Sequence, residues 1–187
     1  HRLLLEDRVE LPRLYLAWHS PRLYGAGDAE LDLVATTLSN GKASRLYRTL
    51  VHERRLATDV TVMQSSRELS GVFQIVATAA PGHPLAELDA VISDELERIG
   101  RDGPSDDELE RSVAQVEAYF VYRLQTVGGF GGKSDQLNGY NVVTGDPGHF
   151  EADLSRYRAA SRAALGEAVR RHLVQSPRVA VSVVPSG

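Results

Sequence analysis

The strongest structural signal in the chain is the stretch SDDELERSVAQVEAYFVYRLQTV, which runs from Ser105 to Val127. It opens with Ser105 and Glu108 in the S-x-x-E spacing of a capping box, in which each side chain bonds the backbone amide of the other residue. Apolar residues then recur every three or four positions, at Leu109, Val113, Val116, Phe120, Leu124 and Val127. Because this spacing places them on one face of a helix, we predict a long helix over 105–127 whose apolar stripe packs against a sheet.

The residues before this helix predict strands and helices in alternation. Strands are expected at 13–18, 58–64 and 72–78, and helices at 28–39, from Ser44 to about residue 50, and at 85–99. Asp28 and Ser44 are the expected N-caps of the first two helices, and Asn40-Gly41 ends the first. The second and third strands are expected to form a hairpin, since the polar segment between them ends in Gly71.

The residues after it predict a glycine-rich connector, three more helices and a final strand. The helices are expected at 133–143, 150–158 and 163–174, and the strand at 178–184. Strands interleaved with helices in this order predict an α+β fold, in which an antiparallel or mixed β-sheet carries several helices on one face, as in ferredoxin-like two-layer folds. We expect residues 1–187 to form a single domain.

Composition excludes several classes of protein. The 187 residues are 42% hydrophobic with a formal net charge of −4, so a nucleic-acid partner, which requires a concentrated basic surface, is not expected. No apolar run approaches the roughly 20 residues of a membrane span, so no membrane partner is expected. The chain has no cysteine, which rules out disulfides, thiolate metal sites and a cysteine nucleophile.

Two short motifs imitate functional sites. His52-Glu53 resembles the start of a zinc-peptidase helix, but none of the six histidines has a second histidine four residues away, so two imidazoles cannot share a helical face. VGGFGGKS, Val127 to Ser134, resembles a phosphate loop, but Val127 replaces the first glycine and a helix, rather than a strand, precedes it. We predict a solvated helix end and a helix–helix connector, and we assign no catalytic, cofactor-binding or metal-binding residue.

Three segments together resemble one domain of the M16 (insulinase, pitrilysin and mitochondrial-processing-peptidase-like) zinc peptidase family. They are NGKASRLYRTLVHERRLATDV (40–60), SGVFQIVATAAPGHPLAEL (70–88) and PSDDELERSVAQVEAYFVYRLQTVGGFGGKSDQLNGYNVVTGDP (104–147). The order and spacing of the three carry the resemblance, since no single motif is diagnostic. The chain is similar to the second, C-terminal-type domain of an M16 half, which lacks the zinc motif H-x-x-E-H.

The resemblance implies a non-catalytic role in a larger protein. We expect the chain, which begins at His1 rather than Met, to be part of a longer zinc metalloendopeptidase. Zinc is expected in a separate domain, and this domain would support it and help to enclose a peptide-binding chamber. The alternatives are a domain of an inactive homologue that acts in assembly and, more distantly, a nucleotide-binding module. The resemblance favours a bacterial source and does not decide between periplasm and cytoplasm.

The family often carries an Arg and a Tyr in L-R-x-x-x-x-L-A-Y, which are thought to hold the peptide opposite zinc. Those two positions are Val51 and Thr58 here, and neither side chain can do that work. The expected partners are other M16 domains of the same polypeptide or of a partner subunit, and peptide substrate through the assembled chamber. The isolated chain is expected either to self-associate or to bind the preceding domain of its parent. The apolar residues expected to face a partner are Tyr119, Val121, Tyr122 and Phe130.

Overall fold

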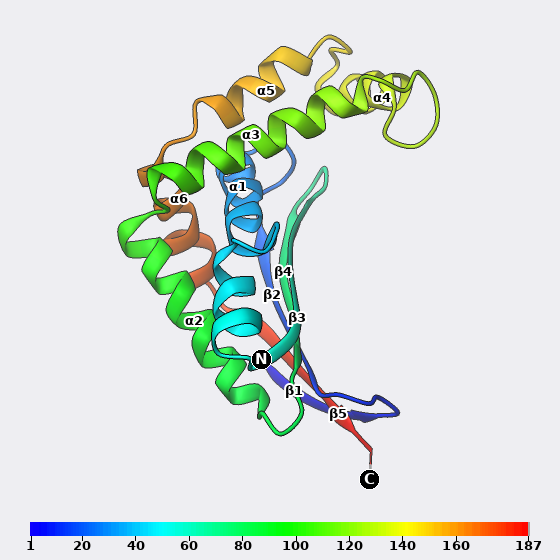
Figure 1. The fold of residues 1–187 in the computed structure, drawn as a ribbon. Helices are drawn as coiled ribbons and strands as arrows, with labels where there is room; N and C mark the ends of the chain where they lie inside the picture. Colours follow the sequence, from blue (N-terminus) through cyan, green and yellow to red (C-terminus); the bar gives the residue numbers. More distant parts are fainter. Residues whose placement is uncertain (187) are drawn as a thin grey trace.

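The computed structural model describes residues 1–186, which form a sheet with helices on one side (Figure 1). The strands are β1 (Arg2–Asp7), β2 (Arg13–Ser20), β3 (Ala57–Ser66), β4 (Gly71–Ala79) and β5 (Arg178–Pro185). The α-helices are α1 (Asp28–Ser39), α2 (Leu85–Asp102), α3 (Asp106–Arg123), α4 (Lys133–Thr144), α5 (Phe150–Arg158) and α6 (Arg162–Val169). Two π-helical segments, η1 (Tyr47–Glu53) and η2 (Arg170–Val174), complete the order.

The sheet is mixed, with strand order β1-β5-β2-β4-β3. The β3–β4 hairpin is confirmed, and β2 pairs antiparallel with both β4 and β5. Strand β1 was not predicted, and it pairs in parallel with β5 at the sheet edge. All six residues of β1 are exposed, and three consecutive leucines give no alternation. Backbone pairing, which leaves no mark in the sequence pattern, is what holds this strand in the sheet.

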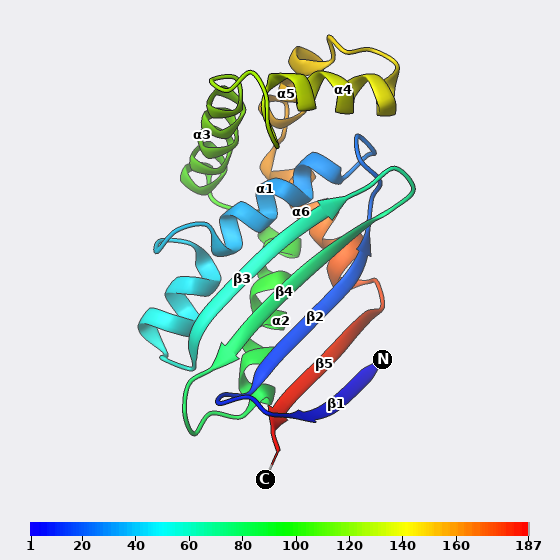
Figure 2. The ribbon, with the colours of Figure 1, turned by 90° about the vertical axis from the view of Figure 1, so that its right-hand side faces the viewer.

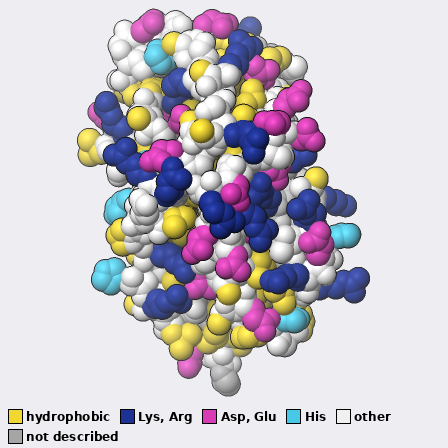
Figure 3. Space-filling view, turned by 90° about the vertical axis from the view of Figure 1, so that its left-hand side faces the viewer, with side chains coloured by type: hydrophobic (Ala, Val, Ile, Leu, Met, Phe, Trp, Pro, Cys, Tyr) yellow, Lys and Arg dark blue, Asp and Glu magenta, His cyan; other side chains and the backbone are white. Residues whose placement is uncertain are grey.

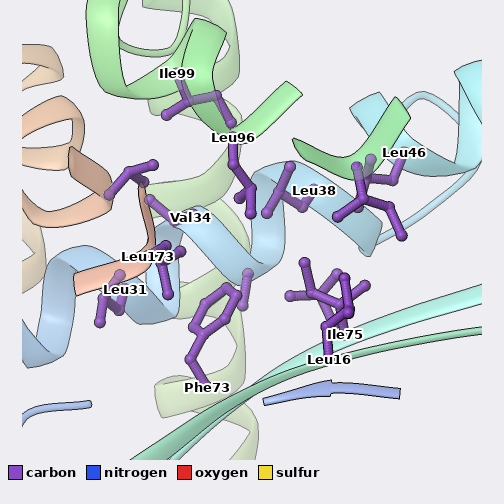
Figure 4. Packing of buried hydrophobic residues seen from close by; sticks show 14 of the residues in the cluster. Leu16, Leu31, Val34, Leu38, Leu46, Phe73, Ile75, Leu96, Ile99 and Leu173 are labelled. Atoms are coloured by element: carbon purple, nitrogen blue, oxygen red, sulfur yellow. The ribbon is translucent and has the colours of Figure 1, made fainter. Parts of the chain in front are cut away.

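The main core lies between the sheet and the helices that cover one of its faces. Figure 4 shows Leu16, Phe73 and Ile75 of the sheet pointing toward helical residues that include Leu38, Leu96 and Leu173. The labelled residues are 0–3% exposed, and burying each such side chain contributes about 1.5–3 kcal/mol. The indole Nε1 of Trp18 donates a 2.9 Å hydrogen bond to the carbonyl of Leu173, which ties β2 to η2.

The predicted packing of the long helix against the sheet is wrong. Helix α3 packs on α1 and α5, because α1 already occupies the space above β3 (Figure 2). The stripe itself faces inward: Phe120 is 8% exposed and meets Phe150 and Tyr157 edge to face at 5.5 and 5.6 Å between ring centroids. Helices α3, α4 and α5 thus form an outer layer at one end of the molecule.

The capping predictions have different outcomes. The Ser105–Glu108 capping box is confirmed, with N–H to oxygen distances of 2.8 and 3.2 Å. Asp28 does not cap α1, because its carboxylate accepts hydrogen bonds from the Tyr24 amide and from Arg156 instead. Ser44 does not cap η1 either, since its hydroxyl donates backward to the Gly41 carbonyl at 2.6 Å. In both cases a tertiary or turn contact captures the polar group that the helix end would have used.

Candidate functional site

The sheet face turned away from the helices is uncovered among residues 1–186 and faces the viewer in Figure 2. A row of cross-strand neighbours crosses it from β1 to β3, in the order Leu3, Val181, Tyr15, Val76 and Thr61. Met63, Val72 and Val179 lie on the same face and are 45%, 44% and 38% exposed. We call this surface the open sheet face. Apolar side chains gathered in this way mark an interaction surface.

The helix-covered side has a different character. Figure 3 shows basic and acidic side chains interspersed over it, with apolar atoms in small groups between them. Helix α2 contributes ion pairs such as Arg98–Glu95 at 2.8 Å. Mixed charge of this kind suits contact with water. The open sheet face is therefore the better candidate for contact with another domain.

The predicted partner residues of the outer layer are exposed. Tyr119, Val121 and Tyr122 on α3 are 57%, 59% and 67% exposed, and Phe130, at the tip of the connector, is fully exposed. The Arg123 guanidinium lies 5.6 Å from the centroid of the Tyr119 ring and donates a hydrogen bond to the Gly131 carbonyl. Their part in binding a partner remains a prediction.

A groove of about 900 Å³ lies between the outer layer, α1 and the edge strand β3. Its walls include the rings of Tyr24, Tyr119, Phe120 and Tyr140. Glycine at position 139 leaves room beside this groove, since no heavy atom lies within 4 Å of where a Cβ would stand. No local pattern predicts the groove, because its walls come from segments more than 100 residues apart.

Arg156 organises the polar floor of the groove. Its guanidinium donates to Asp153 on its own helix and, at 3.0 Å, to Asp28 on α1. The Tyr140 hydroxyl donates to the second Asp153 oxygen at 2.8 Å. Tyr24 packs its ring 4.9 Å from the Arg156 guanidinium, and burial, with help from the Asp153 charge, raises the pKa of Tyr24 to about 12. These contacts tie α4 and α5 to α1.

Asp32 is the carboxylate in the floor of the groove that forms no ion pair with an Arg or Lys side chain of the described residues. It accepts a 2.7 Å hydrogen bond from the Tyr157 hydroxyl, and within residues 1–186 it forms no ion pair, since Arg156 serves the two other carboxylates. Burial is the largest influence on Asp32 and raises its pKa to about 7, which the Tyr157 hydrogen bond only partly offsets. Sequence reasoning placed Asp32 in α1 but gave it no role.

Two glutamines of the groove each have one side-chain amide atom without a hydrogen-bond partner in the described residues. Gln136 is 6% exposed, and its Nε2 has no hydrogen-bond partner in the described part of the chain. Gln64 donates to the Ser66 hydroxyl at 3.1 Å, but its Oε1 is buried and unpartnered in the same set of residues. Buried amide groups without partners are uncommon in folded proteins and destabilise them.

The motifs examined in the sequence lie outside this groove. His52 and Glu53 are exposed at the end of η1, as predicted, and Glu53 lies 3.4 Å from Arg48. Val51 packs its half-buried side chain against the core, and Thr58 is exposed on β3 with its hydroxyl toward the Thr78 carbonyl. Across residues 1–186, no group of three or more His, Asp or Glu side chains could hold a metal ion.

The glycine-rich connector joins two helices, as predicted, and two of its glycines have positive φ. Gly129 and Gly131 have φ of 82° and 77°. The Gly131 amide donates to the Asp135 carboxylate at 2.9 Å, so an acidic group stands where a phosphate loop would place an anion. Over the described range, no helix is long and apolar enough to cross a membrane.

Comparison with known proteins identifies the family. The model of the peptidase M16 inactive domain matches residues 1–116, so the chain belongs to this family of inactive M16 domains. An uncharacterised zinc protease of Streptomyces coelicolor is 29% identical over 98 residues, which cover 52% of this chain and 21% of that protein. The chain therefore spans a minor part of its curated relative.

Solved structures share the fold over nearly the whole chain. The inactive peptidase domain of a candidate zinc protease from Bordetella parapertussis is 24% identical with a TM-score of 0.80, and the match covers 97% of this chain and 95% of that one. A protease from Helicobacter pylori is 20% identical with a TM-score of 0.86, covering 98% of this chain and 44% of that one. A chain of complex III2 from Candida albicans is 15% identical with a TM-score of 0.81, covering 98% and 45%.

Proposed function

We propose that this M16 inactive domain forms part of the wall of a peptide-enclosing chamber in a zinc metallopeptidase and supports a separate domain that holds the zinc. The observation that carries the proposal is the open sheet face, an apolar surface that needs a cover. Several relatives are at least twice as long as the matched region, which leaves room in them for further domains. Val51 stands where the family often carries an Arg, and its side chain has no hydrogen-bond donor to hold a peptide backbone.

A second candidate is a domain of an inactive M16 homologue that acts in assembly. The observations in its favour are Val51 and Thr58 at the two peptide-holding positions and the structural likeness to a chain of a respiratory complex. Both candidates use the open sheet face as a contact. They differ in whether the neighbouring domain binds zinc and cleaves peptide.

The experiment compares this chain, the remaining M16 domains of the same polypeptide, and a mixture of the two. Zinc is measured by elemental analysis, and cleavage is measured with an unfolded, fluorescently labelled peptide. Peptidase function predicts well under one zinc per chain here, zinc in the other domains, and faster cleavage in the mixture. A stable mixture with neither zinc nor cleavage supports the assembly role instead. Zinc and cleavage in this chain alone contradict both.

A further inference from the structure

We propose that the groove between α1, β3 and the outer layer is a binding site for an organic cation, an ammonium group carried on an apolar stem. The inference concerns this domain alone and stands independently of whether the whole protein cleaves peptides. Three features of the groove carry it, namely an unpaired carboxylate, aromatic walls and unpartnered amides.

The charge of the groove favours a cation. The groove is lined by the carboxylates of Asp32, Asp135 and Asp153 and by the guanidinium groups of Arg123 and Arg156. Arg156 pairs with Asp153 and with the neighbouring Asp28, and Arg123 donates to the Gly131 carbonyl. Asp32 is left with the Tyr157 hydroxyl as its hydrogen-bond donor among the described side chains. A carboxylate in a partly dry site gains most from an ammonium group, because a charge-assisted hydrogen bond is about twice as strong as a neutral one. Burial raises the pKa of Asp32, and an ammonium group beside it would lower that pKa by favouring the charged carboxylate.

The walls favour an apolar stem. The rings of Tyr24, Tyr119, Phe120 and Tyr140 line the groove, and aromatic faces attract both alkyl chains and cations. A volume of about 900 Å³ lies within the range of ligand sites in proteins. A strongly hydrated small ion would leave these walls without contact.

The amides favour a ligand that also forms hydrogen bonds. The side chain of Gln136 is buried, with 6% of its surface exposed. Its Nε2 donor and the Gln64 Oε1 acceptor both lack hydrogen-bond partners among residues 1–186. The two glutamines come from α4 and β3, on opposite sides of the groove. Both atoms are buried in the wall of the groove, so a ligand reaches them only when the two side chains turn toward it. An ammonium group would then donate to the Gln64 Oε1, and a carbonyl oxygen of a peptide-like ligand would accept from the Gln136 Nε2.

The test is an NMR titration of the isolated chain with n-butylamine, with 1-butanol as the neutral isostere and N-acetyl-lysine methylamide as a peptide-like probe. We expect saturable shifts of the Gln64 and Gln136 side-chain amides with both amines and not with butanol. Tighter binding of the lysine derivative identifies a peptide side chain as the source of the cation, and equal binding identifies a free amine. Butanol binding as tightly as butylamine, or no saturable binding by either amine, overturns the proposal.

Variants separate binding from folding. Asp32→Asn should weaken butylamine at least about tenfold, because it removes a charged hydrogen-bond partner. The matched control, Glu97→Gln, removes an exposed carboxylate of α2 and should bind like the native chain. If Asp32→Asn does not fold, the affinity of the native chain for butylamine is measured as a function of pH instead. That affinity should rise with pH as Asp32 ionises beside Asp28, Asp153, Arg156 and Tyr157. An affinity that is flat over that range, or unchanged in Asp32→Asn, contradicts the site.

Discussion

The hydroxyl of Tyr157 donates a 2.7 Å hydrogen bond to the carboxylate of Asp32, which joins α5 of the outer layer to α1 of the inner layer. Burial raises the pKa of Asp32 to about 7, above its ordinary value near 3.8. A raised pKa means that the folded state binds the proton more tightly than the unfolded state. Asp32 therefore contributes stability that is fully present below about pH 3.8 and is lost as pH rises through about 7.

Asp32→Asn should remove this pH dependence. Between about pH 5 and pH 8 the native chain should lose roughly 2 kcal/mol of unfolding free energy through this group, and the variant should not. Urea unfolding at several pH values measures the difference, with Glu97→Gln as the control for a lost surface charge. Parallel stability profiles for the native chain and Asp32→Asn would show that Asp32 titrates normally.

The ion pair between Arg45 and Glu108 should have the opposite pH dependence. Burial opposes ionisation of Glu108, but the Arg45 guanidinium, at 2.6 and 2.8 Å, and the Ser105 amide outweigh it and lower the Glu108 pKa to about 2. The stability from this pair is present above about pH 4.5 and is lost as pH falls toward 2. Glu108→Gln should cost about 1–3 kcal/mol at pH 7 and little at pH 2 or below, as measured by urea unfolding. An equal cost at both pH values would rule out the ion pair as its cause.

Phe120 should stabilise the outer layer. Phe120→Ala should cost about 3–5 kcal/mol, because the ring is buried against Phe150 and Tyr157. Hydrogen exchange should accelerate in α3 and α5 more than in β2 and β4, since the helix packs mainly on α1 and α5. Tyr122→Ala, on the exposed side of the same helix, should cost less than about 0.5 kcal/mol. Equal acceleration in the sheet would show that the two layers unfold as one unit.

The prediction from sequence succeeded where a local pattern decides the structure. Helix 28–39 and helix 150–158 have their predicted bounds, and the capping box of α3 forms as expected. The final turns of the predicted long helix failed, because α3 ends at Arg123 and the Gly-rich connector begins four residues later. Helical period identified the inward-facing residues of α3, of which Phe120 is buried and Leu109, Val113 and Val116 are half-buried, whereas Val127 is 72% exposed. It did not identify the surface on which they pack, which depends on where α1 lies.

The groove could not be predicted for a related reason. Asp32 is one of several acidic residues in the sequence, and only the fold brings Arg156 to Asp28 and Asp153 while leaving Asp32 unpaired. The open sheet face was equally hidden. The alternation of β3 and β4 shows which residues share a face, but not that helices cover one side alone.

Self-association should depend on the exposed apolar residues of the outer layer. Tyr122→Ser combined with Phe130→Ser should leave the unfolding free energy within about 0.5 kcal/mol and reduce self-association. Sedimentation velocity over a concentration series measures the change. If the double variant self-associates as strongly as the native chain, the contact lies on another surface. If the native chain is strictly monomeric, the prediction of self-association is contradicted.

The proposed function requires the open sheet face to bind another M16 domain of the same protein. The test is sedimentation equilibrium of this chain mixed with the zinc-bearing domain that the proposed function places in the same polypeptide. We predict a one-to-one complex that is weakened at least about tenfold by Met63→Lys with Val179→Lys, because burying two ammonium groups in an apolar contact is unfavourable. Val174→Lys, at a similarly exposed valine on the helix side, should bind like the native chain. No complex at high micromolar concentration, or a complex that the open-face variant does not weaken, would contradict the account.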